Sequence, residues 1–256
     1  MRSTRGKAER RLILREVPPH FYAVGDVHGC FDLYLALERF IAARLSEAKA
    51  PGLLVLLGDV IDRGPQSAQV LAHLLEPAPA GLTRVLLRGN HEQMMLDFMA
   101  APRAAREWLD HGGIETLQSY GATVGAGRLG EVAKRVIPAT HLAFLRQTPL
   151  CLTAGHWLLA HAGVDPDKSL EAQEADDFLW SDPRDLDHRP MPGYCVVHGH
   201  KPEETPTVAA HRIGLDTGAK ATGRLSAVRL GAQRAEELLV ARRAGGAVSV
   251  DLTALV

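Results

Sequence analysis

Cysteine is scarce in this chain, because only Cys30, Cys151 and Cys195 occur among 256 residues. The count is odd and no two cysteines form a CxxC pair. Neither a disulfide framework nor a cysteine-rich zinc site is therefore expected, and the pattern predicts a reducing, cytoplasmic setting. We expect Cys30, which stands beside a motif described below, to be a small packing residue rather than a nucleophile.

Long apolar runs and an excess of one charge are missing as well. No stretch approaches the roughly 18 apolar residues that a membrane helix needs, and the formal net charge is −1. A chain of balanced charge has no global field that would attract nucleic acid or an anionic membrane. We therefore expect neither of them as a partner.

Basic residues do cluster at the N-terminus. Residues 1–18 begin with a run of arginines and a lysine, and no apolar segment of the kind found in secretory signals follows that run. The run suggests either an interaction arm or a solvated end of the chain. We predict the second, a flexible and poorly ordered segment over 1–18.

The chain beyond this segment has the pattern of an α/β protein. Short apolar runs at 21–24, 53–57 and 84–88 alternate with segments of helical period at 31–48 and 66–76. This alternation predicts parallel strands joined by right-handed crossovers. Two later runs, "WLLAHAG" and "YCVVHG", are typical of strands as well.

Two regions depart from this alternation. From about 91 to 147 the pattern is helical with proline and glycine breaks, and we interpret it as a helical insertion packed on the sheet, too short for a core of its own. The C-terminal runs "GRLSAVRL", "ELLVARR" and "AVSVDL" predict an antiparallel meander. We therefore predict a single domain over 19–256.

Each of the first three predicted strands ends in a polar motif. These motifs are "GDVHG" at 25–29, "GDVIDRG" at 58–64 and "GNHE" at 89–92. Ligands of open α/β sheets bind beyond the carboxyl ends of the strands, so we expect these polar side chains to gather at one edge. The two later strands add His161 in "HAG" and His200 in "GHKP".

A carboxylate at the end of a buried strand, such as Asp59, costs several kcal/mol unless it is paired or binds a metal. The single nearby arginine, Arg63, is not enough to neutralise it together with Asp26 and Asp62. Oxygen and imidazole ligands without thiolates favour Mn, Fe or Zn. Five or six such ligands could hold two ions about 3.5–4 Å apart, bridged by one carboxylate.

In their order, these motifs resemble the signature of the PPP-type metallophosphoesterases, the family of serine/threonine protein phosphatases. The stretches "RGNHEQMM" and "LDTGAKATGRLSAVRL" look most like the small Mn-dependent protein phosphatases of bacteriophages and bacteria. The resemblance covers about residues 20–230. It implies an α/β fold, the four-layer α/β/β/α metallophosphoesterase sandwich.

The resemblance also implies a role for each matching residue. His91 looks like a general acid that Asp62 holds in position, and Arg63 looks like a clamp on the substrate phosphate, which Asn90 also contacts. Two divalent metal ions are implied, Mn²⁺ before Fe or Zn. Their ligands would be Asp26 and His28 for the first ion, Asp59 as the bridge, and Asn90, His161 and His200 for the second.

The implied reaction is hydrolysis of phosphoserine and phosphothreonine monoesters by direct attack of a hydroxide that bridges the two metals. The substrate would be a phosphoprotein or a small phosphate ester. Hydrolases of dinucleoside polyphosphates share these motifs and are the alternative. A metal-bound scaffold without turnover is a third possibility, which the intact His91–Asp62 pair argues against.

The match to the family is loose after Trp180. Phage-like relatives carry Trp-x-Arg, whereas this chain has "WSDPR" with Asp182 in the expected place of the arginine. A second phosphate clamp would be Arg184 or Arg189, and we favour Arg184. In "DHGGIETLQSYG", His111 either lines the substrate groove or has a structural role.

Overall fold

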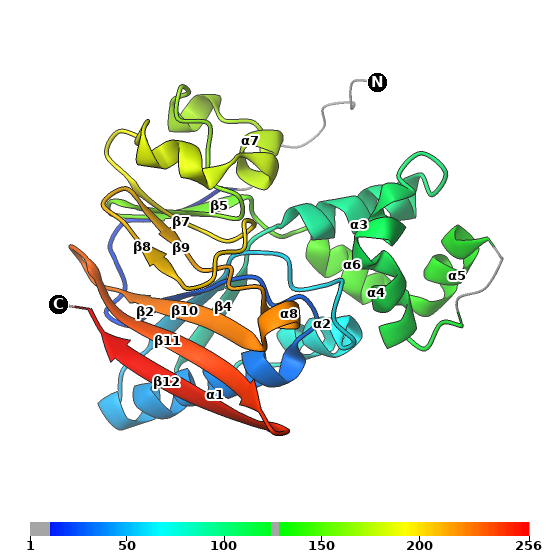
Figure 1. Ribbon diagram of the computed structural model, residues 1–256, viewed down its shortest axis with the longest axis horizontal. Helices are drawn as coiled ribbons and strands as arrows, with labels where there is room; N and C mark the ends of the chain where they lie inside the picture. The colour runs from blue at the N-terminus through cyan, green and yellow to red at the C-terminus, as the bar shows by residue number, and fades with distance from the viewer. Residues whose placement is uncertain (1–10, 124–127, 256) are drawn as a thin grey trace.

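The protein, seen in a computed structural model that describes residues 11–123 and 128–255, is built on two six-stranded sheets with helices on their outer faces (Figure 1). The first sheet has the order β1-β5-β6-β7-β9-β8. Its strands are β1 (Arg11–Leu14), β5 (Cys151–Ala154), β6 (Trp157–Ala160), β7 (Cys195–His198), β8 (Thr207–Val208) and β9 (Arg212–Gly214). In this sheet β6, β7 and β9 run parallel.

The second sheet has the order β12-β11-β10-β2-β3-β4. Its strands are β2 (Phe21–Val24), β3 (Gly52–Leu56), β4 (Leu82–Leu86), β10 (Arg224–Leu230), β11 (Ala235–Ala244) and β12 (Ala247–Ala254). The first three are parallel, and the last three form an antiparallel meander that joins them through β10 and β2. Both features confirm the predictions from the sequence.

Alternate side chains of β2 explain the layering. Phe21 and Ala23 point into a core between the two sheets, whereas Tyr22 and Val24 point into a second core under the helices. All four residues are fully buried, because the strand is covered on both faces. A third apolar cluster lies on the outer face of the first sheet, under α7 (Ala175–Trp180). The result is the predicted α/β/β/α sandwich.

The helix α1 (Phe31–Ala48) has the bounds that its periodicity predicts. Buried residues at spacings of four, Leu33, Leu37, Ile41 and Leu45, form the stripe with which it packs on β10, β11 and β12. The helix ends where Lys49 adopts a left-handed backbone conformation with φ of 51°. The next helix, α2 (Ser67–Leu75), follows the loop after β3.

Short helices occupy the region between residues 90 and 145 and gather at one end of the sandwich, coloured green in Figure 1. They are α3 (Asn90–Ala100), η1 (Leu109–Gly113), α4 (Ile114–Ser119), α5 (Leu129–Val136) and α6 (Ala139–Leu145). Three smaller helices lie elsewhere: η2 (Leu170–Ala172), η3 (Pro183–Asp187) and α8 (Ala219–Thr222). Within the described ranges, no helix has the length and apolar character to span a membrane.

The prediction of a poorly ordered segment over 1–18 is wrong for residues 11–14, which form β1 at the edge of the first sheet. Leu12 and Leu14 pack against the core between the sheets, while Ile13 points outward. The guanidinium of Arg11 lies 5.3 Å from the ring centre of Phe178. The alternation in "RLIL" was a strand signal that the basic residues around it obscured. The basic residues at positions 2–10 lie outside the described residues.

Candidate metal centre

The polar motifs meet at one edge of the sandwich, because each follows the carboxyl end of a strand in one of the two parallel sets. Asp26 and His28 follow β2, and Asp59 follows β3. Asn90 and His91 open α3 after β4. His161 and His200 follow β6 and β7 in the facing sheet. Loops that follow strands of both sheets therefore supply the side chains of the cluster.

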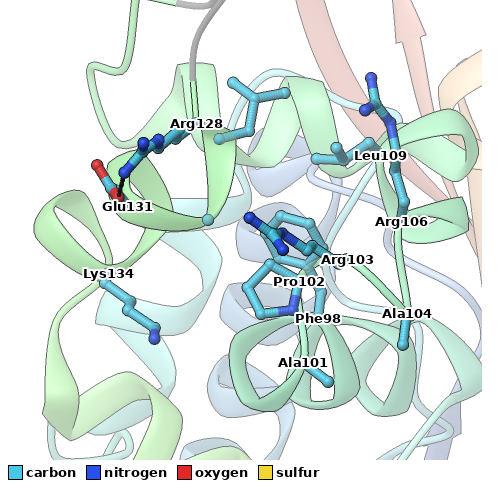
Figure 2. Close-up of a pocket in the computed structure, with 12 residues that line it drawn as sticks. Phe98, Ala101, Pro102, Arg103, Ala104, Arg106, Leu109, Arg128, Glu131 and Lys134 are labelled. Carbon is cyan, nitrogen blue, oxygen red and sulfur yellow. Dashed lines mark hydrogen bonds and ion pairs between the residues drawn. The ribbon is translucent and has the colours of Figure 1, made fainter.

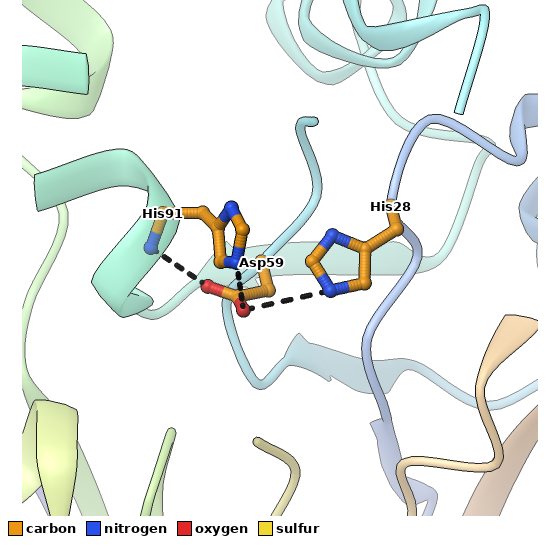
Figure 3. A group of neighbouring side chains, drawn as sticks. All are labelled: His28, Asp59 and His91. Carbon is orange, nitrogen blue, oxygen red and sulfur yellow. Dashed lines mark hydrogen bonds and ion pairs between the residues drawn. The ribbon is translucent and has the colours of Figure 1, made fainter. Parts of the chain in front are cut away.

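The carboxylate of Asp59 is at the centre of this cluster. His28 Nε2 lies 3.6 Å and His91 Nε2 3.7 Å from Asp59 Oδ2, and His161 Nε2 lies 3.4 Å from Oδ1. Figure 3 shows the rings of His28 and His91 on either side of this carboxylate. All of these side chains are buried. Because both oxygens of Asp59 face imidazoles, this carboxylate can bridge two cations.

Two groups of potential ligand atoms share Asp59. In each group the atoms lie within 4.8 Å of one another. One group joins Asp59 with His28 and His91, and the other joins it with Asp26 and His161. The predicted partner of His28 was Asp26 rather than His91, and His28 Nε2 also lies 4.0 Å from Asp26 Oδ2. Judged by distances alone, His91 could therefore be a metal ligand in addition to the six predicted ones.

Asn90 joins the two histidines from the facing sheet. Its Oδ1 lies 2.7 Å from His161 Nε2 and 3.2 Å from His200 Nδ1. The other nitrogen of His161 donates to the carbonyl of Leu57 at 3.0 Å. That bond turns Nε2 toward both Asn90 and Asp59. The three side chains predicted to hold the second ion therefore converge on one point.

The side chain of His28 provides the test of whether a cation fits. Its Nδ1 lies 2.8 Å from the carbonyl of Ile61, which can only accept, so the proton is on Nδ1 and Nε2 carries a lone pair. Among the described residues, this buried Nε2 has no hydrogen-bond partner. Burial lowers the pKa of His28 to about 3, which keeps the ring neutral. An unpaired lone pair buried among carboxylates fits a bound metal ion.

The pKa values of the carboxylates also indicate that a cation fits this cluster. Burial disfavours the charge of Asp59, but nearby His161, His91 and His28 outweigh that effect and hold its pKa below the usual range. Burial, together with neighbouring Asp216 and Asp59, raises the pKa of Asp26. Carboxyl groups this close repel one another when ionised. Divalent cations would remove that repulsion, so the residues present fit the implied metal ions.

The backbone around these ligands is strained. His28, Asp59, Asp62, Arg63 and His200 all have positive φ, between 43° and 70°. Such conformations cost non-glycine residues of order 1–3 kcal/mol each and persist where the surroundings enforce them. Two neighbouring glycines are sterically required: a Cβ at Gly199 would lie 1.9 Å from Asp26 Oδ1, and one at Gly89 would lie 2.1 Å from Asp59 Oδ1.

His91 and Asp62 form a hydrogen-bonded pair beside the cluster, with Nδ1 of the histidine 2.8 Å from Oδ2 of the aspartate. Burial alone would lower the pKa of His91, but Asp59 and the bonded Asp62 raise it above its usual value. Trp108 Nε1 and Thr116 Oγ1 also donate to the carboxylate of Asp62. The helical insertion therefore holds Asp62, and Asp62 orients His91.

Arg63 lies at the exposed side of this pair. Its Nη2 is 2.9 Å from His91 Nε2, and its backbone N–H bonds to the carbonyl of Gly112 in η1. The ring centre of His111, also in η1, lies 6.4 Å from that of His91. The predicted clamp and the predicted acid are thus adjacent, and η1 borders both.

The two arginines considered as a second phosphate clamp form ion pairs away from the cluster. Arg184 forms an ion pair with Asp182, while Arg189 pairs with Asp167 and Asp185 on the surface. Neither bonds to the cluster within the described part of the chain. The loop of Arg184 does begin beside the cluster, because the ring centre of Trp180 lies 6.2 Å from that of His200. The assignment of Arg184 stays a prediction.

Several residues at or beside the cluster were not identified from the sequence. Asp216 follows β9 in "LDTG", and burial raises the pKa of this carboxyl to about 6. An aspartate after a strand is the same signal that identified Asp26 and Asp59, but no strand was predicted at the position of β9. Trp108 and Thr116 lie in a helical region without a motif, where only the folded chain places them.

Glu92 has a further role that its motif did not reveal. The carboxylate accepts the backbone N–H groups of Asp59, Val60 and Gly89, each at 2.8 Å, and so ties together the loops after β3 and β4. Burial and the neighbouring Asp59 raise the pKa of Glu92 to about 7. The position of Asp59 therefore depends on this buried side chain.

We expect Glu92→Ala to destabilise the fold by roughly 3 kcal/mol or more, because each buried group left without a partner costs about 1–3 kcal/mol. Glu92→Gln, which keeps one acceptor oxygen, should lose less. Urea unfolding with a chelator present separates this effect from metal binding. An alanine variant as stable as the wild type would show that the three N–H groups do not depend on Glu92.

The comparisons with known proteins agree with this geometry. The calcineurin-like phosphoesterase family matches residues 19–234. The chain is 32% identical over 216 residues to serine/threonine-protein phosphatase 1 of Salmonella typhimurium, covering 82% of this chain and 92% of that protein. It is 34% identical over 145 residues to the symmetrical bis(5'-nucleosyl)-tetraphosphatase of Dechloromonas aromatica, covering 57% of this chain and 44% of that protein.

A solved structure agrees in fold. The cold-active protein-tyrosine phosphatase of a psychrophile, Shewanella sp., superposes with a TM-score of 0.57 at 18% identity, covering 94% of this chain and 81% of that one. The family match includes strands of both sheets and every strand-end motif. The chain belongs to the calcineurin-like phosphoesterase family and, like the related PPP-type phosphatases, is a phosphoric ester hydrolase.

Proposed function

We propose that this protein hydrolyses phosphoserine and phosphothreonine monoesters in proteins, with divalent metal ions at the Asp59 cluster. The observation that carries the proposal is the hydrogen-bonded His91–Asp62 pair, which lies directly beside a buried carboxylate shared by two groups of ligand atoms. A binding scaffold has no need of a positioned acid. A phosphoesterase needs one to protonate the leaving group.

The proposed ligands are the predicted six. Asp26 and His28 would hold one ion, Asn90, His161 and His200 the other, and Asp59 would contact both. Bound divalent ions would supply Lewis-acid stabilisation of phosphoryl charge and an acidified water nucleophile. We propose Mn²⁺ as the metal, because imidazole and carboxylate ligands without thiolate suit it, with Fe or Zn as alternatives.

The chain's own groups would act on both sides of the phosphoryl group. Arg63, next to His91, can donate to phosphoryl oxygens through its guanidinium fork. Asn90 and, from the loop after Trp180, Arg184 are proposed as further phosphate contacts. Once the substrate phosphate draws the guanidinium of Arg63 away from His91 Nε2, the protonated ring would give the proton on Nε2 to the departing alkoxide, while its Nδ1 stays bonded to Asp62. No covalent intermediate on the chain is required.

Protonation of His91 predicts the pH dependence. Bound ions would offset the charge of Asp59, but the hydrogen-bonded carboxylate of Asp62 still favours the acidic form of His91 and raises its pKa. Turnover should fall as pH rises through that pKa, because only the acidic form can donate a proton. Asp62→Asn removes this charge and should shift the basic limb of the kcat profile by about one unit to lower pH. Asparagine tolerates the positive φ of this position.

The measurement is a pH–rate profile with an alkyl phosphate for both proteins. Asp251→Asn, at an exposed carboxylate in β12, is the control and should leave the profile unchanged. A basic limb that does not move in Asp62→Asn would mean that this limb does not report His91.

Two relatives support different substrates. The serine/threonine phosphatase relative is matched over 92% of its own length, whereas the symmetrical tetraphosphatase is matched over only 44% of its length. This difference favours the protein phosphatase over the symmetrical enzyme, and the asymmetrical tetraphosphatase of Bacillus anthracis, matched over 88% of its length, is only 25% identical against 32% for the phosphatase. The identity of 34% within the shorter match keeps dinucleoside polyphosphate hydrolysis as the second candidate.

A substrate panel tests the choice. Purified protein with Mn²⁺ should hydrolyse phosphoserine and phosphothreonine peptides at least tenfold more efficiently, in kcat/KM, than diadenosine tetraphosphate. A tenfold preference for the dinucleotide would replace the proposed substrate by the second candidate. No turnover of any ester with any divalent metal would contradict both. The reducing, cytoplasmic setting and the lack of nucleic-acid or membrane partners stay predictions.

A further inference from the structure

A pocket in the helical insertion lies apart from the metal centre. It has a volume of about 660 Å³, within the range of ligand-binding pockets. The C-terminal end of α3, the following segment over 101–106, η1 and the start of α5 surround it. Figure 2 shows its lining residues. None of the proposed metal ligands lines this pocket.

The lining combines an apolar floor with a positively charged rim. Phe98 and Leu109 are buried at the base, and Pro102 lies with them. Four cationic side chains also line the pocket, whereas a single acidic residue does so. The cationic residues are Arg103, Arg106, Arg128 and Lys134, and all four are exposed. A ligand here would therefore need negative charge and an apolar group.

Most of this positive charge is uncompensated. The one acidic residue of the lining, Glu131, pairs with Arg128 at 3.0 Å, as the dashed line in Figure 2 shows. Within the described ranges, Arg103, Arg106 and Lys134 form no ion pair. Exposed arginines bind carboxylates through two parallel hydrogen bonds, so the rim is complementary to an acidic partner.

We propose that this pocket docks an acidic peptide segment that carries an apolar side chain, within the phosphoprotein substrate. The inference rests on the proposed function. A nucleotide fits less well, because base recognition uses an exposed aromatic face, and the only aromatic side chain among the described lining residues, Phe98, is 1% exposed. A peptide needs only carboxylates for the rim and an aliphatic group for the floor.

The position of the pocket suits a substrate that also reaches His91. Both ends of α3 are involved, since His91 lies in its first turn and Phe98 lies in its last turn. The ten residue-to-residue steps from His91 to Ala101 correspond to about 15 Å along a helix axis. An extended peptide covers that distance in about five residues. The helix η1 links the two places as well, with Leu109 at the pocket and His111 beside His91.

Peptide binding tests the site independently of turnover. The probe is a fluorescent, unphosphorylated peptide with four glutamates around one leucine, and fluorescence anisotropy gives its Kd. The double variant R103E/K134E should raise that Kd at least tenfold. The matched control R39E/R135E has the same change in charge at exposed positions outside the pocket, one of them next to Lys134 in α5. It should change Kd less than twofold.

Kinetics then connect the pocket to the reaction. The substrates are two phosphoserine peptides in which the acidic segment lies five residues before or after the phosphoserine, and p-nitrophenyl phosphate. The pocket variant should raise KM about tenfold for at least one peptide with kcat unchanged. It should leave p-nitrophenyl phosphate hydrolysis within twofold of the wild type, because none of the altered residues contacts the metal cluster.

The outcomes separate the two proposals. Equal losses in the pocket variant and the charge control, or equal binding of a peptide with glutamines in place of the glutamates, would overturn the docking site. If diadenosine tetraphosphate displaces the peptide, and if R103E/K134E weakens the binding of that nucleotide, the peptide proposal would also be overturned in favour of a nucleotide site. Pocket-dependent peptide binding without hydrolysis of any phosphopeptide would support the docking site and contradict the proposed phosphatase activity.

Discussion

Asp59→Asn should lower phosphoesterase activity by roughly 10³-fold or more, because this carboxylate is the one side chain shared by both groups of ligand atoms. Asparagine keeps the size and one oxygen but loses the charge that His28, His91 and His161 surround. The backbone should tolerate the change, since asparagine adopts the positive φ of this position more readily than most residues. The loss should therefore reflect charge and ligation rather than folding.

Activity with saturating Mn²⁺ and p-nitrophenyl phosphate is the measurement, with circular dichroism to show that the variant is folded. Asp251→Asn is the matched control, because that carboxylate is exposed on β12 and, within the described residues, pairs only with Arg242. A folded Asp59→Asn protein with activity within tenfold of the wild type would be incompatible with a bridging role.

His91→Gln should reduce turnover by about 10²–10⁴-fold on an alkyl phosphate, the usual range for loss of a general acid. The loss should be much smaller on p-nitrophenyl phosphate, because p-nitrophenolate is a weak base that leaves without a proton. Glutamine can still bond to Asp62 and therefore tests proton donation more than packing. His141→Gln, in α6 and outside the cluster, is the control.

The same variant separates the two roles that geometry admits for His91. A proton donor can be removed without loss of metal, whereas a ligand cannot. His91→Gln should therefore retain the metal content of the wild type, measured on the purified protein by mass spectrometry. Loss of an ion, or an equal loss of rate on both esters, would show that His91 acts as a ligand and that the acid is another group.

The sequence was sufficient to predict which side chains meet at one edge of the sandwich. Asp26, Asp59, Asn90, His161 and His200 each follow a strand, and parallel strands bring their carboxyl ends to one edge. The order of strands and helices alone determines this edge, and apolar periodicity reveals that order for β2, α1 and β3. The short motifs then indicated which side chains project there.

The remainder depends on packing between distant segments. Nothing in the helical pattern of 91–147 indicates that Trp108 and Thr116 donate to Asp62, because their separations of 46 and 54 residues are closed only in the fold. The basic pocket likewise combines the end of α3 with the start of α5. For β1 the difficulty was different, since four residues of alternating pattern are a weak signal beside a run of arginines.

The most direct test of the account is anomalous diffraction from crystals grown with Mn²⁺, recorded near the manganese edge. We expect two peaks per chain, one beside Asp26 and His28 and the other beside Asn90, His161 and His200, with oxygens of Asp59 contacting both. No peak at this cluster, or peaks that Asp59 does not contact, would contradict it.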